Sequence, residues 1–170
     1  MWSRRRVVFV GVAGAVAAGA ALMLPRLGSS AAPSGVALAS EHADMLRAVT
    51  QALLGSALPT DVDARNRELT RVTTATGALI TNLPPATRKE IADLFGLLAL
   101  KPARALLGYS GDWVGADIPA VATFLAGLRD SSIGLKQQAY FALHDLLLGS
   151  FYADPSAWAA TGYPGPPQLT

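Results

Sequence analysis

The chain has 170 residues, of which 51% are hydrophobic and 15% are charged, and it contains no cysteine. This length predicts one domain with at most a tail, and the hydrophobic content excludes a disordered chain. The lack of cysteine excludes disulfides, thiolate metal sites and cysteine nucleophiles. Four arginines and no acid precede Ser40, whereas ten basic and twelve acidic residues follow from Ser40 onward, a net charge of −2. This mildly acidic part lacks the basic footprint of a nucleic-acid binder.

The N-terminus has the order of an export signal, a basic stretch followed by an apolar one. Arg4 and Arg5 follow Ser3, and an uncharged run rich in Gly and Ala occupies residues 7–24. This order resembles the twin-arginine export motif, so we expect Arg4 and Arg5 to direct export by that route to the periplasm or the extracytoplasmic face of the membrane. A membrane anchor is the alternative, because eighteen apolar residues are at the short end of what spans a bilayer. Membrane contact is expected only through this segment.

Five later segments have apolar residues recurring at three and four positions, which predicts helices. They are expected at residues 40–54, 62–82, 86–100, 118–129 and 133–153. Pro102 interrupts the third, and residues 103–107 are expected to add one turn. No alternating strand pattern is present. We therefore predict an all-α fold, an irregular bundle of five to six helices preceded by an N-terminal signal or anchor helix.

The pattern also predicts helix starts, buried positions and the division of the chain. Ser40 is expected to cap the first helix, and Asp61 or Asp63 the second. Leu79 is expected on the apolar face of the second helix, and Leu135 is one of the apolar residues of the last helix. The last helix is nearly apolar all round in its second half, which predicts a place at the centre of the bundle. The expected division is a signal segment and linker at 1–39, a helical domain at 40–153 and a tail at 154–170.

Few side chains offer chemistry. The only histidines are His42 and His144. His144 precedes Asp145, but adjacent helical positions point about 100° apart, so these two side chains are not expected to face each other as an acid–base pair. Tyr109 and Trp113 lie in a Gly-rich loop and are expected to cover the core, with partner contact as the alternative. We therefore expect no catalytic, cofactor-binding or metal site in this chain.

The C-terminal segment leaves the last helix at Asp154-Pro155 and ends in a Pro/Gly-rich stretch. Proline fixes φ and lacks a donor N–H, so this stretch is neither helix nor central strand. Trp158 and Tyr163 are large aromatics on a segment too short to bury them well, so they either cap the core or anchor a partner. The residues that we predict to bind a partner are Trp158, Gly162, Tyr163, Pro164, Gly165, Pro166 and Pro167.

Residues spread along most of the chain from about residue 40, together with the twin-arginine start, form a wider pattern. They are Leu83, Pro84, Pro85, Leu94, Phe95, Leu97, Leu98, Trp113, Phe124, Leu125, Leu128, Arg129, Ser131, Tyr140, Leu143, Tyr152 and the tail from Trp158 to Pro167. With them the chain resembles the small accessory subunits of exported FAD-dependent dehydrogenases of the glucose–methanol–choline oxidoreductase type, including gluconate, sorbitol and glucose dehydrogenases. The tail is the specific part of this resemblance.

The resemblance implies a division of labour between two subunits. A large subunit holds FAD and carries out the reaction, while this chain carries the export signal and supports folding, export and assembly of the large subunit. A Cys-x-x-Cys-His haem site is absent from the sequence, so this chain is not the electron-carrying subunit. A stand-alone or membrane-tethered helical binding protein of the cell envelope is the alternative, and a small lyase or hydrolase that uses His144 is a third.

Overall fold

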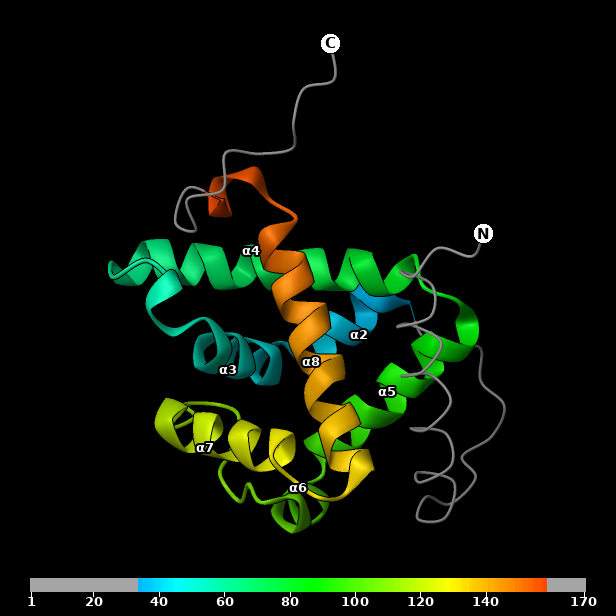
Figure 1. Cartoon of the computed structure of the whole chain (residues 1–170). Helices are drawn as coiled ribbons and strands as arrows, with labels where there is room; N and C mark the ends of the chain where they lie inside the picture. Colours follow the sequence, from blue (N-terminus) through cyan, green and yellow to red (C-terminus); the bar gives the residue numbers. More distant parts are fainter. Residues whose placement is uncertain (1–33, 159–170) are drawn as a thin grey trace, which may run out of the picture.

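The computed structural model describes residues 34–158, whose arrangement is shown in Figure 1. These residues form seven α-helices, two short 3₁₀ turns and no strand, so the predicted all-α class is confirmed for them. The elements are α2 (Gly35–Glu41), α3 (Ala43–Leu54), η1 (Gly55–Ala57), α4 (Val62–Thr81), α5 (Pro85–Ala99), α6 (Lys101–Leu107), α7 (Ile118–Arg129), α8 (Gly134–Tyr152) and η2 (Pro155–Ala157). The predicted N-terminal signal or anchor helix, with Arg4 and Arg5, lies outside the described residues.

The predicted count of five to six helices is too low for the described residues, because α2 precedes the expected first helix, which corresponds to α3. Ser40 does not cap it. Ser34 begins α2, and its hydroxyl accepts a hydrogen bond from the N–H of Ala37 at 3.2 Å. His42, with φ −109° and ψ 24°, separates α2 from α3. The sequence pattern indicates a linker at Gly35, but this glycine is the first residue of α2 and is buried.

Gly35 is buried because α2 crosses α4 at a pair of glycines. A Cβ at Gly35 would lie 2.4 Å from the carbonyl oxygen of Gly77 and 2.5 Å from the backbone nitrogen of Thr81. The buried face of α4 consists of Leu69, Val72, Thr73, Thr76, Gly77 and Ile80. Leu79, predicted to be buried, is 37% exposed, whereas Ile80 is fully buried. Eleven residues make just over three full helical turns, so the position that returns to the face of Leu69 is Ile80.

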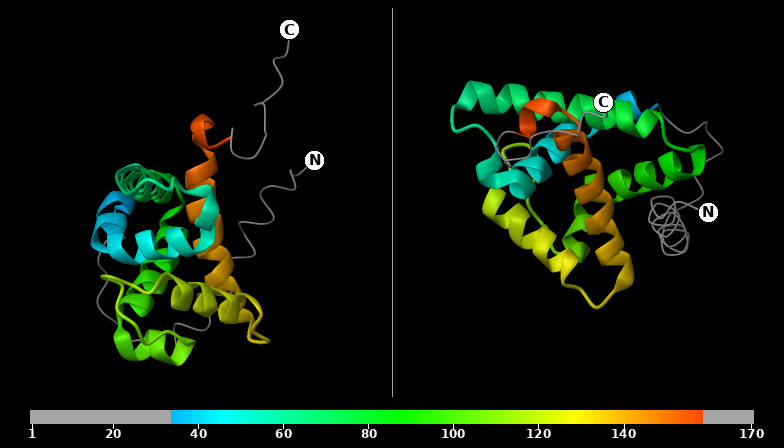
Figure 2. Two further views of the ribbon diagram at one scale, coloured as in Figure 1. Left: turned by 90° about the vertical axis from the view of Figure 1, so that its left-hand side faces the viewer. Right: turned by 45° about the horizontal axis from the view of Figure 1, so that its top comes forward.

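The last helix, α8, contacts α4, α3 and α7 with one side only. Its buried residues are Ala139, Leu143, Leu146, Leu147, Ser150 and Phe151. At the crossing with α4 the buried hydroxyl of Thr76 donates to that of Ser150 at 3.0 Å. The other side exposes Leu135 by 39%, Phe141 by 46% and Tyr152 by 37%. α8 is therefore not buried all round, as a helix at the centre of the bundle would be. It runs across the front of the bundle in Figure 1 and along its edge in the left view of Figure 2.

The loop between α6 and α7 is held by Arg104, which is only 4% exposed. Its guanidinium pairs with the carboxylate of Asp112 at 3.0 Å and lies 5.5 Å from the ring centre of Trp113. The indole N–H of Trp113 donates to the carbonyl oxygen of Leu98 at 2.9 Å, and Tyr109 is 5% exposed. The prediction that Tyr109 and Trp113 cover the core is confirmed.

The remaining helix boundaries agree with the prediction to within two residues. Asp61 is the cap of α4, since its carboxylate accepts a hydrogen bond from the N–H of Ala64 at 2.8 Å. Pro85 occupies the first position of α5, where the missing N–H of proline costs nothing. Local capping and proline rules thus place most helix ends, while the glycine contact with α4 decides where the first helix begins.

The glycine crossing generates a stability prediction. We expect Gly35→Ala to lower the free energy of unfolding by about 1–3 kcal/mol, because its Cβ would meet backbone atoms of α4 that cannot move aside cheaply. Gly96→Ala in α5 is the matched control, since a Cβ there has nothing within 4 Å and alanine should stabilise the helix by roughly 0.5–1 kcal/mol. Urea denaturation of both variants measures the difference. Equal effects at the two positions would contradict the close crossing.

Candidate partner-binding site

The described start of the C-terminal segment, residues 154–158, is a packed continuation of α8. The helix ends at Tyr152 ahead of Pro155, and Asp154 before the proline is extended, with φ −89° and ψ 125°. The carboxylate of Asp154 accepts a hydrogen bond from the N–H of Ser156 at 2.8 Å and so caps η2. Ala157 is 6% exposed and belongs to the core. Local capping and burial together order the chain this far.

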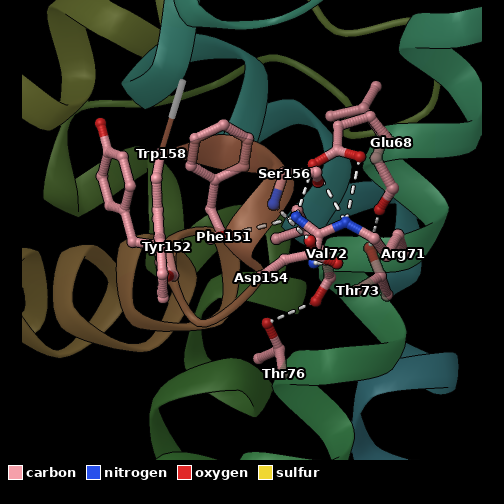
Figure 3. Close-up of polar contacts among 11 residues, drawn as sticks. Glu68, Arg71, Val72, Thr73, Thr76, Phe151, Tyr152, Asp154, Ser156 and Trp158 are labelled. Atoms are coloured by element: carbon pink, nitrogen blue, oxygen red, sulfur yellow. Dashed lines mark hydrogen bonds and ion pairs between the residues drawn. The ribbon is translucent and has the colours of Figure 1, made fainter. Parts of the chain in front are cut away.

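Arg71 on α4 reaches this segment with its guanidinium group, as Figure 3 shows. Its Nε donates to both carboxylate oxygens of Glu68, at 3.1 and 3.0 Å. Its Nη1 lies 3.4 Å from the carboxylate of Asp154, and its Nη2 donates to the carbonyl oxygen of Phe151 at 3.3 Å. The guanidinium carbon is 5.9 Å from the ring centre of Phe151. We call Glu68, Arg71 and Asp154 the Arg71 clasp.

The charges of the clasp are stabilised by its own hydrogen bonds. The hydrogen bond to Glu68 raises the pKa of Arg71 above its usual value. Hydrogen bonds from Ser156, through its side chain and its backbone, lower the pKa of Asp154 below the ordinary 3.8, and the charge of Arg71 adds to this shift. The side chains of Arg71, Glu68 and Asp154 remain 28%, 20% and 34% exposed, so solvent screens their attraction.

Trp158 ends the described part of the chain. Its indole N–H donates to the carbonyl oxygen of Tyr152 at 2.8 Å, and its backbone N–H donates to that of Pro155 at 3.1 Å. Trp158 and Tyr152 lie on one side of Phe151 and Arg71 on the other in Figure 3. The structure therefore places the first predicted partner-binding residue at a defined position beside the end of α8. The other predicted partner-binding residues lie outside the described residues: Gly162, Tyr163, Pro164, Gly165, Pro166 and Pro167.

Sequence reasoning missed Arg71. The helical period places Arg71 and Glu68 on the polar face of α4, and nothing near them in the sequence indicates a partner beyond each other. The contact between Arg71 and Phe151 joins positions 80 residues apart. Only the packing of α8 across α4 brings them together, so no local signal would have found this site.

The prediction that His144 and Asp145 cannot face each other is wrong. Their Nδ1 and Oδ1 atoms are 2.9 Å apart, although the two residues are neighbours on α8. The side chains are 35% and 49% exposed, and free rotation about their bonds in solvent lets them turn toward one another. The ring of Tyr140 lies 5.6 Å from that of His144. Among the described residues, no group of three or more His, Asp and Glu side chains could hold a metal ion.

Two open hollows lie beside the α6–α7 loop, with volumes of about 840 and 500 Å³. The smaller one is lined in part by His42, whose pKa is lowered by burial while the charge of Glu41 opposes the shift. The ring of His42 also packs edge-on against Phe95 at 5.5 Å. Within the described part of the chain, neither hollow is lined by residues of the C-terminal segment.

Comparisons with models of known protein families, with curated proteins and with solved structures found no match to this chain. None of the helices in residues 34–158 has the length and apolar character needed to cross a membrane. A proposal of function therefore depends on the residues and contacts described above and on the resemblance carried by the sequence.

The lowered pKa of Asp154 generates a pH prediction. An acid with a lowered pKa in the folded state stabilises the protein fully above its unfolded value of 3.8, and this contribution is lost as the pH falls through the folded value. Asp154→Asn keeps an acceptor for the N–H of Ser156 but does not titrate. We expect the difference in unfolding free energy between wild type and this variant to be constant from about pH 7 to 5 and to narrow below about pH 4. Urea denaturation across this range measures it; a difference independent of pH would contradict an ionised Asp154.

Proposed function

We propose that this chain is a non-catalytic small subunit that supports the folding, export and assembly of an FAD-dependent dehydrogenase large subunit outside the cytoplasm. In this proposal the large subunit holds FAD and performs the reaction, and this chain provides a binding surface and the export signal. Two observations support this proposal: the family resemblance of the sequence and the contacts at the end of α8.

The observation that supports it most directly is the ordered base of the C-terminal segment. Contacts with α4 and α8 hold residues 154–158, so Trp158 is presented from a defined position. An aromatic side chain that is already positioned loses less conformational freedom on binding, and Trp and Tyr are the commonest anchors of protein interfaces. A segment built in this way suits protein binding better than chemistry.

The outward side of α8 gives a second line of support. Phe141 and Tyr152 are 46% and 37% exposed, and Leu148 between them is half-buried. Positions seven and eleven residues apart return to nearly the same side of a helix, so these three side chains share one face that leads to Trp158. Apolar side chains gathered on one exposed face are typical of surfaces that meet another protein. We infer that the large subunit contacts this face together with the tail.

The proposed export route explains why signal and binding surface would be on one chain. The twin-arginine system transports folded proteins, so a subunit with the signal can carry a folded partner that has none. Arg4 and Arg5 engage the export machinery in this proposal, and the complex reaches the periplasm or the extracytoplasmic face of the membrane.

The tail is tested by separating fold stability from partner capture. We expect Tyr163→Ala, or truncation after Thr161, to leave the melting temperature nearly unchanged but to weaken binding of the flavoprotein by about 2 kcal/mol or more, roughly 30-fold. Tyr163→Phe is the control, because it keeps the ring and should retain most of the binding. Thermal melting and pull-down of the co-expressed large subunit measure the two properties. A collapse of the melting temperature would mean that the tail belongs to the core, and a wild-type chain that captures no flavoprotein would favour a stand-alone binding protein.

Export is tested by the arginine pair. We expect the double variant Arg4→Lys and Arg5→Lys to remain in the cytoplasm together with the large subunit, because the twin-arginine pathway requires the arginine pair. Arg5 is the informative position, since Arg6 offers a second pair that also includes it. Cell fractionation with antibodies against both subunits measures the outcome. Normal export of the double variant would exclude this route.

A further inference from the structure

We propose that Arg71 is a positioning residue for the C-terminal tail: the Arg71 clasp fixes residues 154–158 against α4 and thereby sets the point at which the tail leaves the fold. The clasp itself is a property of this chain alone. Its effect on partner binding rests on the function proposed above.

Arg71 makes contacts with three separate parts of the chain. Its planar guanidinium binds Glu68 within α4, the last turn of α8 at Phe151 and the segment beyond α8 at Asp154. An arginine fork can serve several acceptors at once, which a lysine ammonium cannot do in a fixed plane. Glu68 orients the fork, and the other two contacts point it at the C-terminal segment.

Asp154 connects the contact with Arg71 to the residues that lead to Trp158. One carboxylate oxygen of Asp154 faces Arg71, while the other accepts the N–H of Ser156. The N–H groups of Ala157 and Trp158 then donate to the carbonyl oxygens of Asp154 and Pro155, both at 3.1 Å. A continuous series of contacts therefore runs from α4 to Trp158, the last described residue.

The Arg71 clasp contributes little to the free energy of unfolding of the whole domain. Its side chains are partly exposed, so solvent screens the ion pairs and they contribute little to the free energy of unfolding. The crossing of α8 over α4 is held by buried side chains such as Phe151 and Ser150 whether or not Arg71 is present. The free energy of the clasp acts instead on residues 154–158, which open locally without unfolding of the core.

The test uses the full chain and a pair of matched variants, Arg71→Met and Arg67→Met. Arg67 lies one turn earlier on α4, is exposed, and makes no hydrogen bond or ion pair with any other described residue. Chymotrypsin cleavage after Tyr152 and Trp158, followed by mass spectrometry, reports local opening of the segment. We expect cleavage at these two sites to be several-fold faster in Arg71→Met and unchanged in Arg67→Met. Equal rates in the two variants would overturn the proposal.

A second, more conservative variant tests whether the effect of Arg71→Met comes from the contact with Asp154 or from a general loss of stability. Asp154→Asn removes the ion pair but retains an acceptor for Ser156, so we expect a smaller increase in cleavage. Because Arg71 and Asp154 act through one contact, the double variant should be cleaved at nearly the rate of Arg71→Met alone. Fully additive effects would overturn a shared role. So would faster cleavage at sites throughout α3 to α7, which would mark Arg71 as an ordinary stabilising residue.

Pull-down of the flavoprotein provides the functional readout. We expect Arg71→Met to reduce capture several-fold with an almost unchanged melting temperature, and Arg67→Met to capture as wild type does. Rescue by Arg71→Lys should be poor, because lysine keeps the charge but not the fork. Unchanged capture by Arg71→Met would overturn the positioning role. If the wild-type chain captures no flavoprotein, the proposed function fails. The cleavage rates then still decide whether the Arg71 clasp orders residues 154–158.

Discussion

The close approach of α2 and α8 to α4 is the constraint on which the rest of the structure depends. Where these helices cross, the face of α4 carries Gly77 and Thr76 instead of large side chains. Gly35 leaves room for backbone contact on α2, and Ser150 supplies a small partner for Thr76 on α8. Both hydroxyls also lie within hydrogen-bonding distance of a carbonyl oxygen one turn earlier in their own helix, so their burial leaves no polar atom unsatisfied. Small residues therefore fix the position of both helices with little tolerance for larger ones.

The polar site at the end of α8 follows from this packing and does not cause it. Thr76 lies five residues after Arg71 on α4, and Ser150 lies four residues before Asp154 on the other side of the crossing. Fixing the hydroxyl pair thus brings the two charged groups to ion-pair distance. A partly exposed ion pair is too weak to hold two helices together, but it is strong enough to order a short segment such as residues 154–158. Side-chain packing therefore positions the helices, and the ion pair orders only the short segment after α8.

The nearly uniform apolar character of α8 connects fold and proposed function. A helix at the edge of a bundle needs only one apolar side, yet α8 presents Phe141 and Tyr152 to solvent as well. Phe141 and Tyr152 lie outside the buried core of the described residues, and a partner that covers them would bury their exposed area. The same helix leads to Trp158, and in the proposed function a large subunit binds along this side of α8. In the proposed function, the class of partner comes from the resemblance to dehydrogenase small subunits, and this side of α8 is the proposed contact surface.

The sequence by itself determined the helical class and most helix ends, because hydrophobic period, capping residues and prolines act over a few positions. It also placed Tyr109 and Trp113 over the core. It could not show that Gly35 belongs to a buried helix, since Gly35 packs against Gly77 more than forty residues later. Nor could it show which side of α8 is exposed, or that Arg71 reaches Phe151 and Asp154. Those features depend on how helices cross, and the crossings are decided by backbone contacts between residues that are distant in the chain.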